Sequence, residues 1–300
     1  MPQNGIPYRG RFAPSPTGPL HLGSLIAALA SYLDARHHGG LWLMRMEDLD
    51  PPREEPGAAQ CILHSLRCHG LDWDGQVMWQ GQRLHAYGRA RARLADAGHL
   101  FRCACTRASL GPDGACGGRC AARQGTLAEP TAARVRVPEG WYIEFEDLIQ
   151  GMQASDLGRE MPDFVIRRKD GLDAYQLAVV VDDAEQGVTH VVRGSDLLDS
   201  TPRQVCLQQL LGCPTPVYAH LPVIANDQGR KFSKQNHAPP LDDGRAVDNL
   251  LLALRFLQQP APPAGISTVS EVLAFATPRW DVARVPAATA IPAARFGLPG

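Results

Sequence analysis

The N-terminal part of the chain alternates short apolar runs with polar turns. Residues 8–13 form a short strand-like run, and a turn rich in proline and glycine separates it from an alanine-rich helical stretch at 24–35. An apolar run at 41–46 then leads into an acidic cluster that begins at Glu47. Strand, loop, helix and strand in this order predict the beginning of a parallel α/β sheet. Ligands of such sheets collect at the carboxyl ends of the strands, so we expect a binding site at the 13–24 loop and Glu47.

The pattern changes in the middle of the chain. A helical stretch rich in arginine and alanine at 82–97 precedes a segment crowded with cysteine and glycine. Alternating stretches at 134–137 and 142–145 then have the period of small antiparallel strands. These features indicate an insertion between two halves of the sheet.

Apolar strand patterns resume after this insertion. They occupy residues 163–166, 178–181 and 188–192, and a helical pattern follows at about 202–211. We interpret them as the second half of the parallel sheet. Further along, prolines surround a helical run at 247–257, which indicates a small helical appendage with a loose tail.

The sequence therefore predicts an α/β protein: a Rossmann-type parallel sheet with a cysteine-rich insertion and a small helical C-terminal appendage. We expect four segments: the first half of the sheet-containing domain at 1–100, the insertion at 101–162, the second half of that domain at 163–235, and the helical appendage and tail at 236–300.

Composition narrows the class of protein. The 300 residues are 44% hydrophobic, and 30 basic side chains nearly balance 31 acidic ones. This excludes a disordered tail, a collagen-like fibre and a disulfide miniprotein, and any contact with nucleic acid must use a local basic patch. The N-terminus lacks a cationic stretch followed by an apolar core, and no window approaches the ~20 apolar residues of a membrane span. We therefore expect a cytoplasmic protein that is not bound to membranes.

Four of the eight cysteines crowd into one short, glycine-rich segment: Cys103, Cys105, Cys116 and Cys120. Four thiolates in close pairs on tight turns suit tetrahedral Zn²⁺, and a closed set of four has a structural role. The alternative is four reduced thiols on a loop. In a reducing compartment we favour one structural zinc ion over a disulfide framework.

Two segments carry candidate chemistry for phosphate. The stretch from Arg11 to Ser24 places a rigid turn, His21 and Gly23 at the start of a helix, where backbone N–H groups and the helix dipole favour anions. Taken singly, His21 could equally be an ordinary helix cap. The stretch from Gly229 to Gln235 reads by itself as a solvated basic turn. However, it contains two of the three lysines in a chain with 27 arginines, which indicates a need for a compact ammonium group there.

Considered together, these two segments resemble the two signatures of class I aminoacyl-tRNA synthetases. His-Leu-Gly-Ser at 21–24 and Lys-Phe-Ser-Lys-Gln at 231–235 match them in order and spacing. Residues 45–50 and 163–204 extend the resemblance, which covers roughly residues 8–240, to the catalytic half of glutamyl-tRNA synthetases. Only 65 residues follow Gln235, too few for the anticodon-binding region of those enzymes. The combination is similar to a short paralogue that attaches glutamate to the queuosine base of tRNA(Asp).

The resemblance implies a site for L-glutamate, which presents an ammonium group and two carboxylates. A selective pocket then needs an acid, a guanidinium group and small polar donors. At the matching positions stand Arg11, Ala13, Ser15, Glu47, Tyr175 and Arg193. Glu47 suits the ammonium group, while arginine, serine and tyrosine side chains suit the carboxylates. Their structural alternatives are surface ion pairs for the arginines and core packing for Tyr175.

The resemblance also implies ATP with Mg²⁺, and formation of glutamyl-adenylate and pyrophosphate without tRNA. The residues implied to bind ATP are His21, Gly23, Ser24, Lys231, Ser233 and Lys234. Of these, Lys234, assisted by Lys231, is expected to stabilise the transition state, with His21 holding the phosphates. Three positions depart from the stricter family signatures, since Ser24 replaces a second histidine, Phe232 a methionine and Gln235 a serine. We expect altered loop dynamics from them rather than lost activity.

Two alternative functions remain open. One is a truncated glutamyl-tRNA synthetase that charges the 3′ end of a tRNA, although it would lack a grip on the anticodon stem. The other is a non-catalytic paralogue that binds glutamate or RNA. A degenerate copy should have lost pocket charges or signature lysines, yet Glu47, Arg193 and Lys234 are present.

Overall fold

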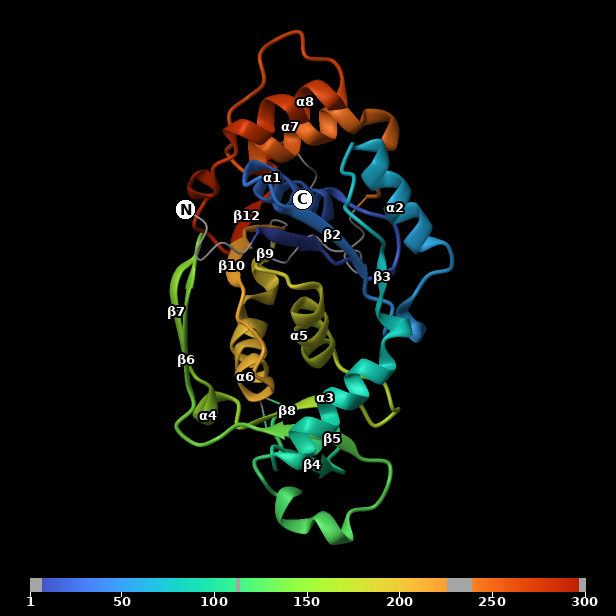
Figure 1. The fold of residues 1–300 in the computed structure, drawn as a ribbon, viewed down its shortest axis with the longest axis vertical. Coiled ribbons are helices and arrows are strands. Elements are labelled where there is room, and N and C mark those ends of the chain that lie inside the picture. Colours follow the sequence, from blue (N-terminus) through green and yellow to red (C-terminus); the bar gives the residue numbers. More distant parts are fainter. Residues whose placement is uncertain (1–6, 112–113, 226–238, 297–300) are drawn as a thin grey trace.

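A computed structural model of the protein describes residues 7–111, 114–225 and 239–296. Its central sheet contains two groups of strands (Figure 1). One group pairs in the order β1–β2–β3, all parallel, and consists of β1 (Arg9–Phe12), β2 (Leu41–Met46) and β3 (Met78–Trp79). The other pairs in the order β7–β6–β10–β9 and consists of β6 (Tyr142–Asp147), β7 (Gly151–Asp156), β9 (His190–Gly194) and β10 (Val217–Leu221).

Strands β9, β10 and β6 are parallel, and only β7 runs antiparallel to its neighbour. Thr189 joins the two groups. Its backbone N–H donates to the carbonyl of Arg9 at 2.9 Å, and its hydroxyl accepts from the backbone N–H of Arg9 at 2.9 Å. β1 therefore lies beside β9, and the predicted parallel α/β sheet is confirmed.

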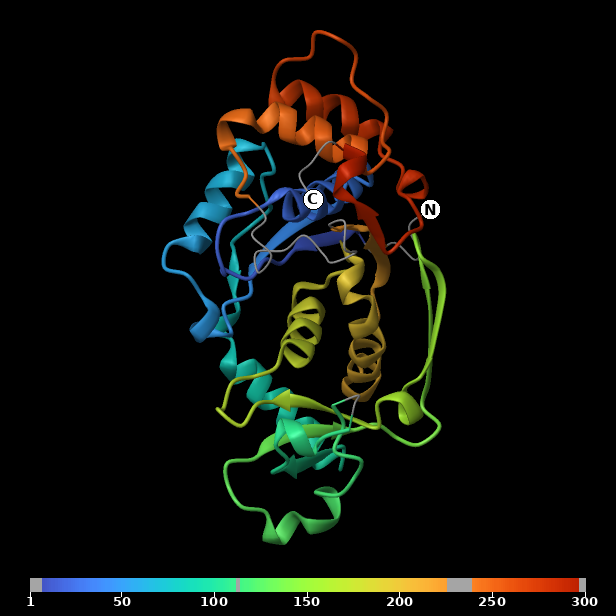
Figure 2. The same cartoon turned by 180° about the vertical axis from the view of Figure 1, so that it is seen from behind.

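Helices cover both faces of this sheet (Figures 1 and 2). One face packs against α1 (Leu22–His37), α7 (Ala246–Phe256) and α8 (Val269–Ala276), and the other against α3 (Leu84–Asp96), α5 (Tyr175–Gln186) and α6 (Thr201–Leu211). Helix α1 has buried residues on nearly every side, so small alanines let the sheet and α7 approach it closely. Helix α2 (Ala58–Cys68) flanks the first group of strands, and α4 (Leu157–Glu160) follows β7.

The prediction of a strand at 178–181 is wrong, because these residues lie in the middle of α5. The run of valines suggested a buried strand, but α5 packs between the sheet and its neighbours α3 and α6. Burial on several sides makes a helix apolar without a clear period, and tertiary packing then overrides the strand preference of valine. The helix ends at Gly187, whose φ of 64° places it in the left-handed region that glycine tolerates.

The strand expected to resume the central sheet at 163–166 belongs elsewhere. It is β8 (Asp163–Arg167), which pairs antiparallel with β5 (Ala132–Arg136), and β5 pairs antiparallel with β4 (Leu100–Cys103). This separate sheet forms the end of the molecule opposite α7 and α8 (Figure 1). Conversely, the stretch at 142–145, expected as a small strand of the insertion, lies in β6, which pairs with β7 and joins the central sheet through β10. The division of the chain into four segments remains a prediction.

The described part of the C-terminal segment is not a loose tail. Leu250, Leu254 and Phe256 of α7 are buried against the core that contains α1. Further on, β12 (Ala290–Pro292) pairs parallel with β11 (Val223–Ala225). The abundant prolines misled the prediction, because proline breaks helices and strands without preventing burial.

Candidate functional site

The carboxyl ends of β1, β2, β9 and β10 meet at a cavity of about 770 Å³. All described residues proposed from the sequence for glutamate or ATP line this cavity, and they are Arg11, Ala13, Ser15, His21, Gly23, Ser24, Glu47, Tyr175 and Arg193. The other three, Lys231, Ser233 and Lys234, lie outside the described residues. Arg11 and Arg193, which lie far apart in the sequence, therefore share one pocket, as the sheet topology predicts.

The first helix points its N-terminus into this cavity. His21 is the N-cap of α1, and its Nδ1 accepts a hydrogen bond from the backbone N–H of Ser24 at 3.2 Å. The first turn of α1 contains no acidic side chain. Backbone N–H groups at a helix N-terminus carry partial positive charge, so this end of the cavity suits phosphate oxygens.

A cluster of buried charges adjoins the cavity, which two of its members, Arg11 and Glu47, line. Asp183 of α5 accepts from Arg11 Nε at 3.3 Å and from Arg45 Nη1 at 2.7 Å. Arg45 also reaches Glu47, with 3.7 Å between Nη2 and Oε1. Burial by itself would raise the pKa of Asp183, but the charges of Arg11 and Arg45 outweigh it and hold the pKa below its ordinary value. Asp183 is therefore ionised and neutralises part of the positive charge of this cluster.

Glu47 is the acidic side chain of this cluster that lines the cavity. Burial raises its pKa to about 7, although the charges of Arg45 and Arg11 act in the opposite direction. A carboxyl group with this pKa is only half ionised at neutral pH while the cavity lacks a cation. A ligand ammonium group beside it would favour the ionised form.

Arg193 presents a second buried guanidinium group to the cavity. Among the described residues its hydrogen-bond partners are all neutral: the hydroxyl of Tyr175 at 3.4 Å, the hydroxyl of Thr201 at 2.8 Å, the carbonyl of Leu197 at 3.5 Å and the ring of His220 at 3.0 Å. Isolated buried charges are unfavourable in proteins, whereas an anion at the same place would pair with the charge. This part of the cavity is therefore suited to a carboxylate.

The cavity thus combines three complementary features. It has a guanidinium group for a carboxylate, a carboxyl group for an ammonium group, and a helix N-terminus for phosphate. An amino acid with an acidic side chain and a nucleotide fit this arrangement together.

Asp183 and Arg45 are not among the site residues predicted from the sequence, although their charges act on Arg11 and Glu47, which line the cavity. Arg45 lies in β2, two residues before Glu47 of the acidic cluster, and Asp183 ends the Val-Val-Val-Asp-Asp run of α5. The misplaced strand at 178–181 concealed the second signal. With that run read as a helix, Tyr175 and Asp183 lie two turns apart on one element that faces β1 and β2.

The four clustered cysteines do not line the cavity; they lie at the end of β4 and in the segment after it, in the lower part of Figure 1. The Sγ atom of Cys105 lies 3.7 Å from that of Cys116 and 3.6 Å from that of Cys120. All four ligand atoms, including that of Cys103, lie within 4.8 Å of one another. Tetrahedral coordination with Zn–S bonds of about 2.3 Å requires S–S distances of about 3.8 Å. The cluster therefore could hold a metal ion of this size.

Asp163 fixes the turn that carries two of these cysteines. Its Oδ1 accepts from the backbone N–H of Cys116 and its Oδ2 from that of Gly117, both at 2.9 Å. Arg134 of β5 in turn donates to the same carboxylate. The thiols are thereby attached to the sheet β4–β5–β8 by buried polar contacts rather than by loop residues alone.

Across the residues that the structure describes, no helix is long and apolar enough to cross a membrane.

Comparison with known proteins agrees with this geometry. The family model of the catalytic domain of class I tRNA synthetases (E and Q) matches residues 8–112 and 121–250. The glutamyl-Q tRNA(Asp) synthetase of Pseudomonas fluorescens is 52% identical over 292 residues, which cover 96% of this chain and 97% of that protein. The enzyme of the same name from Neisseria meningitidis serogroup B is 52% identical over 289 residues, covering 93% and 97%.

Solved structures give the same relationship at the level of the fold. The glutamate tRNA ligase of Elizabethkingia meningosepticum, determined in complex with its amino acid, has a TM-score of 0.78 at 26% identity. The match covers 94% of this chain and 66% of that one. The glutamate-tRNA synthetase of Elizabethkingia anophelis has a TM-score of 0.79 at 26% identity, covering 97% and 69%. This chain belongs to the glutamyl-Q tRNA(Asp) synthetases, a group within the class I tRNA synthetase family for glutamate and glutamine.

Proposed function

We propose that this protein is a ligase that activates L-glutamate with ATP in the absence of tRNA, and then transfers glutamate to the queuosine base in the anticodon of tRNA(Asp). In the first step the α-carboxylate of glutamate attacks the α-phosphorus of ATP. Pyrophosphate leaves, and glutamyl-adenylate forms. In the second step the modified base displaces AMP. We place this activity in the cytoplasm, where ATP, glutamate and tRNA are present.

The observation that carries this proposal is the presence of Arg193 and Glu47 in one cavity. Arg193 has neutral partners, and Glu47 has a pKa near neutrality, so each gains a charged partner when glutamate binds. In this proposal the carboxylates of glutamate are bound by Arg11, Ser15, Tyr175 and Arg193, with Ala13 beside them and Glu47 on the ammonium group. The proposed contacts follow from the charges that line the cavity.

ATP would occupy the end of the cavity at the N-terminus of α1. His21, Gly23 and Ser24 line this end and would hold the phosphates. Lys231, Ser233 and Lys234 would complete the site, with Lys234 as the main stabiliser of charge on the reacting phosphate and Lys231 assisting. Two described residues flank their segment: Ile224 lines the cavity, and Pro240 forms a β-bridge with His21. Mg²⁺ bound to ATP would neutralise phosphate charge.

The cysteine cluster would bind one structural Zn²⁺ ion. Its support is the set of four thiols with tetrahedral spacing, and a set of four protein ligands leaves no position open for catalysis. We propose that zinc stiffens the part of the molecule that approaches tRNA.

The decisive experiment is a transfer assay with labelled glutamate, ATP and tRNA(Asp). Two tRNA(Asp) preparations are compared, one with queuosine and one with unmodified guanosine at the same position. We expect label only on the queuosine-containing tRNA. Label on both preparations, released as from a 3′-terminal ester, would contradict the proposal and favour a truncated glutamyl-tRNA synthetase. Glutamate-dependent exchange of pyrophosphate into ATP tests the first step alone, and its absence would favour a non-catalytic paralogue.

A further inference from the structure

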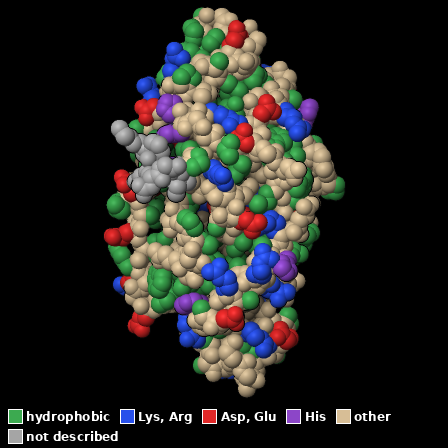
Figure 3. Space-filling view, in the orientation of Figure 1, with side chains coloured by type: hydrophobic (Ala, Val, Ile, Leu, Met, Phe, Trp, Pro, Cys, Tyr) green, Lys and Arg blue, Asp and Glu red, His purple; other side chains and the backbone are tan. Residues whose placement is uncertain are grey.

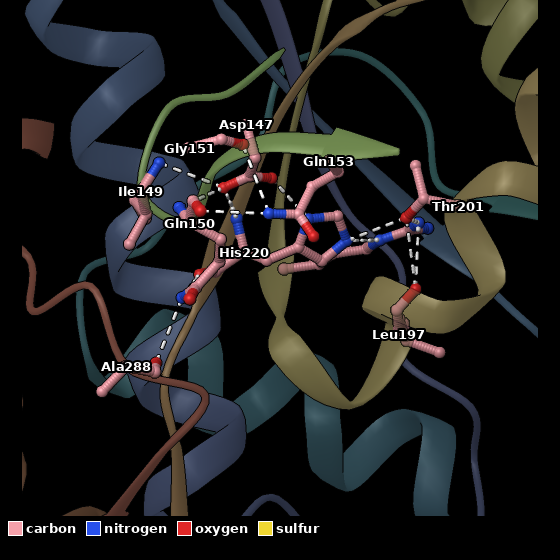
Figure 4. A network of polar contacts seen from close by, with 10 residues as sticks. Asp147, Ile149, Gln150, Gly151, Gln153, Leu197, Thr201, His220 and Ala288 are labelled. Atoms are coloured by element: carbon pink, nitrogen blue, oxygen red, sulfur yellow. Dashed lines mark hydrogen bonds and ion pairs between the residues drawn. The ribbon is translucent and has the colours of Figure 1, made fainter. Parts of the chain in front are cut away.

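His220 and Asp147 connect Arg193 to the hairpin β6–β7, and Figure 4 shows these two residues with the polar groups around them. Arg193 Nε donates to Nε2 of His220 at 3.0 Å. On the other side of the ring, Nδ1 of His220 lies 2.6 Å from Oδ2 of Asp147. Both Asp147 and His220 have fully buried side chains, and neither lines the cavity. A buried chain of hydrogen bonds thus connects a pocket side chain to the end of β6.

This geometry determines where His220 carries its proton. An arginine Nε–H can only donate, so Nε2 of His220 must accept. An ionised carboxylate can only accept, so Nδ1 of His220 must carry the hydrogen. The ring is therefore neutral, with its proton on Nδ1. Burial lowers the pKa of His220, in agreement with a neutral ring, although the hydrogen bond to Asp147 acts in the opposite direction.

Asp147 cannot rotate freely, because its other oxygen is already occupied. Oδ1 accepts from the backbone N–H groups of Ile149 at 3.0 Å, Gln150 at 2.9 Å and His220 at 3.1 Å. Oδ2 is thereby directed at the imidazole ring. The turn after β6 therefore fixes the carboxylate, the carboxylate fixes the ring, and the ring offers one acceptor at a defined place to Arg193.

The remaining contacts of Arg193 explain why this acceptor is needed. Thr201 Oγ1 and the carbonyl of Leu197 accept from Nη2, and both lie on the same side of the network in Figure 4. Nε2 of His220 accepts from Nε of Arg193, and the hydroxyl of Tyr175 accepts from its Nη1. These two contacts then define the plane and rotation of the guanidinium group. Together with those to Thr201 and Leu197, these contacts use four of the five N–H groups of Arg193 and leave one on Nη1, which meets a ligand carboxylate only when the planar group is correctly oriented.

We propose that Asp147 and His220 are positioning residues for glutamate binding: they hold the guanidinium group of Arg193 in the orientation that receives a carboxylate. This inference rests on the function proposed above. It predicts an effect on glutamate from Asp147, a residue that does not contact the cavity.

The first test is Asp147→Asn, which keeps the size of the side chain. Three backbone N–H groups hold the amide oxygen at the place of Oδ1, so the amide NH₂ faces His220. His220 must then accept at Nδ1 and carry its proton on Nε2, opposite the N–H of Arg193. Two donors cannot face each other at 3.0 Å, so Arg193 must turn. We expect the KM for glutamate in pyrophosphate exchange to rise about tenfold or more, with the KM for ATP within twofold of wild type.

The second test separates the two sides of the ring. In His220→Gln the side-chain oxygen can reach the place of Nε2 and accept from Arg193. In His220→Asn the amide can only take the place of Nδ1 and donate to Asp147. We expect His220→Gln to retain a lower KM for glutamate than His220→Asn. A purely structural role would instead lower kcat through loss of folded enzyme in both variants, because KM does not depend on the amount of active protein.

Gln150→Ala serves as the matched control. Gln150 Nε2 donates to the carbonyls of His220 at 2.8 Å and Ala288 at 3.1 Å, so it attaches the same hairpin without acting on Arg193. We expect a lower melting temperature and an unchanged KM for glutamate. A glutamate KM near wild type in folded Asp147→Asn, or equal KM values in the two His220 variants, would overturn the inference. Wild-type enzyme without glutamate-dependent exchange would count against the proposed function instead.

Discussion

At the scale of single residues, the two pocket arginines differ in what surrounds them. Arg11 pairs with ionised Asp183, so its charge is largely neutralised before a ligand arrives. Arg193 has only neutral hydrogen-bond partners among the described residues. An approaching carboxylate therefore gains more from Arg193, because its positive charge is not already shared with an acid. Glu47 is the complementary group, and its partial ionisation makes the site sensitive to pH.

Glutamate binding should strengthen as the pH rises through neutrality. Burial raises the pKa of Glu47 to about 7 in the empty site, so the group is mostly protonated at pH 6 and mostly ionised at pH 8. Only the ionised form pairs with the ammonium group of glutamate. We therefore expect the KM for glutamate to fall about tenfold from pH 6 to pH 8. Glu47→Gln should raise the KM and remove this pH dependence. A wild-type KM that stays constant over this range would contradict the assignment.

The role proposed for Lys234 can be tested by single substitutions, because the chain contains only three lysines. Lys234→Ala should slow glutamate-dependent pyrophosphate exchange by about 10²–10³-fold, the usual effect of removing one preorganised stabiliser of the transition state. The KM for glutamate should change little. Lys169→Ala is the control, since Lys169 donates to the carbonyl of Ala104 at 2.7 Å and does not line the cavity. Equal activity of the two variants would show that the role given to Lys234 is wrong.

At the scale of elements, helix α5 connects the site to the rest of the fold. Its first residue, Tyr175, lines the cavity, and Asp183 near its end pairs with Arg11 and Arg45. The neighbouring Asp182 accepts from Gln80 at 2.8 Å, Arg83 at 2.7 Å and Tyr87 at 2.7 Å. Helix α5 therefore supplies a pocket residue. Through Asp183 it also holds β1 and β2, and through Asp182 it holds the segment that contains Gln80, Arg83 and Tyr87.

The cysteine cluster lies outside the cavity, so its proposed role in binding zinc can be tested separately from glutamate activation. Protein purified without chelator should contain close to one zinc ion per chain, as measured by elemental analysis. Cys116→Ser should remove most of this metal and lower the melting temperature, because Cys116 is fully buried and is held by Asp163. Pyrophosphate exchange should be affected less than transfer to tRNA, since the cluster lies outside the cavity.

Cys61→Ser is the control for this experiment, because Cys61 is exposed and lies on α2, outside the cluster. It should leave the zinc content unchanged. Wild-type protein without near-stoichiometric zinc would contradict the assignment of the metal.

At the scale of the whole molecule, the C-terminal segment completes the core of the N-terminal half. Helices α7 and α8 lie over α1 at one end of the molecule, opposite the cysteine-containing end (Figures 1 and 2). The indole N–H of Trp280 also donates to Asp34 of α1 at 2.8 Å. The surface is less distinctive: basic, acidic and apolar side chains interleave over the face drawn in Figure 3, in keeping with the net charge of −1.

If α7 is part of this core, then shortening one of its buried side chains should destabilise the whole protein. Leu250 is fully buried, and Leu250→Ala should lower the free energy of unfolding by about 2–5 kcal/mol through lost burial and a residual cavity. Asp248→Ala on the same helix removes only an exposed ion pair with Arg245 and should have little effect. Urea unfolding of the two variants distinguishes these outcomes. Similar midpoints for both would mean that α7 unfolds independently of the sheet.

Much of the fold was accessible from local pattern alone. Residues 41–46 form β2 as predicted, and 24–35 lie within α1, because a short apolar run, alanine content and flanking glycine report local preference directly. The order of these elements also placed His21 and Glu47 at one edge of a parallel sheet, where the structure has them. The four cysteines were recognisable because short spacing keeps them close in any fold.

The amino-acid sequence by itself thus determined which residue types are present, their local structure and the family resemblance that they carry. Only the tertiary structure decided which buried groups become partners. It made 178–181 a helix, moved 163–167 into the smaller sheet, and paired Arg11 with a residue 172 positions away. It also placed His220 and Asp147 behind Arg193. The physical reason is that burial and charge pairing depend on neighbours in space, whereas periodicity and propensity report neighbours along the chain.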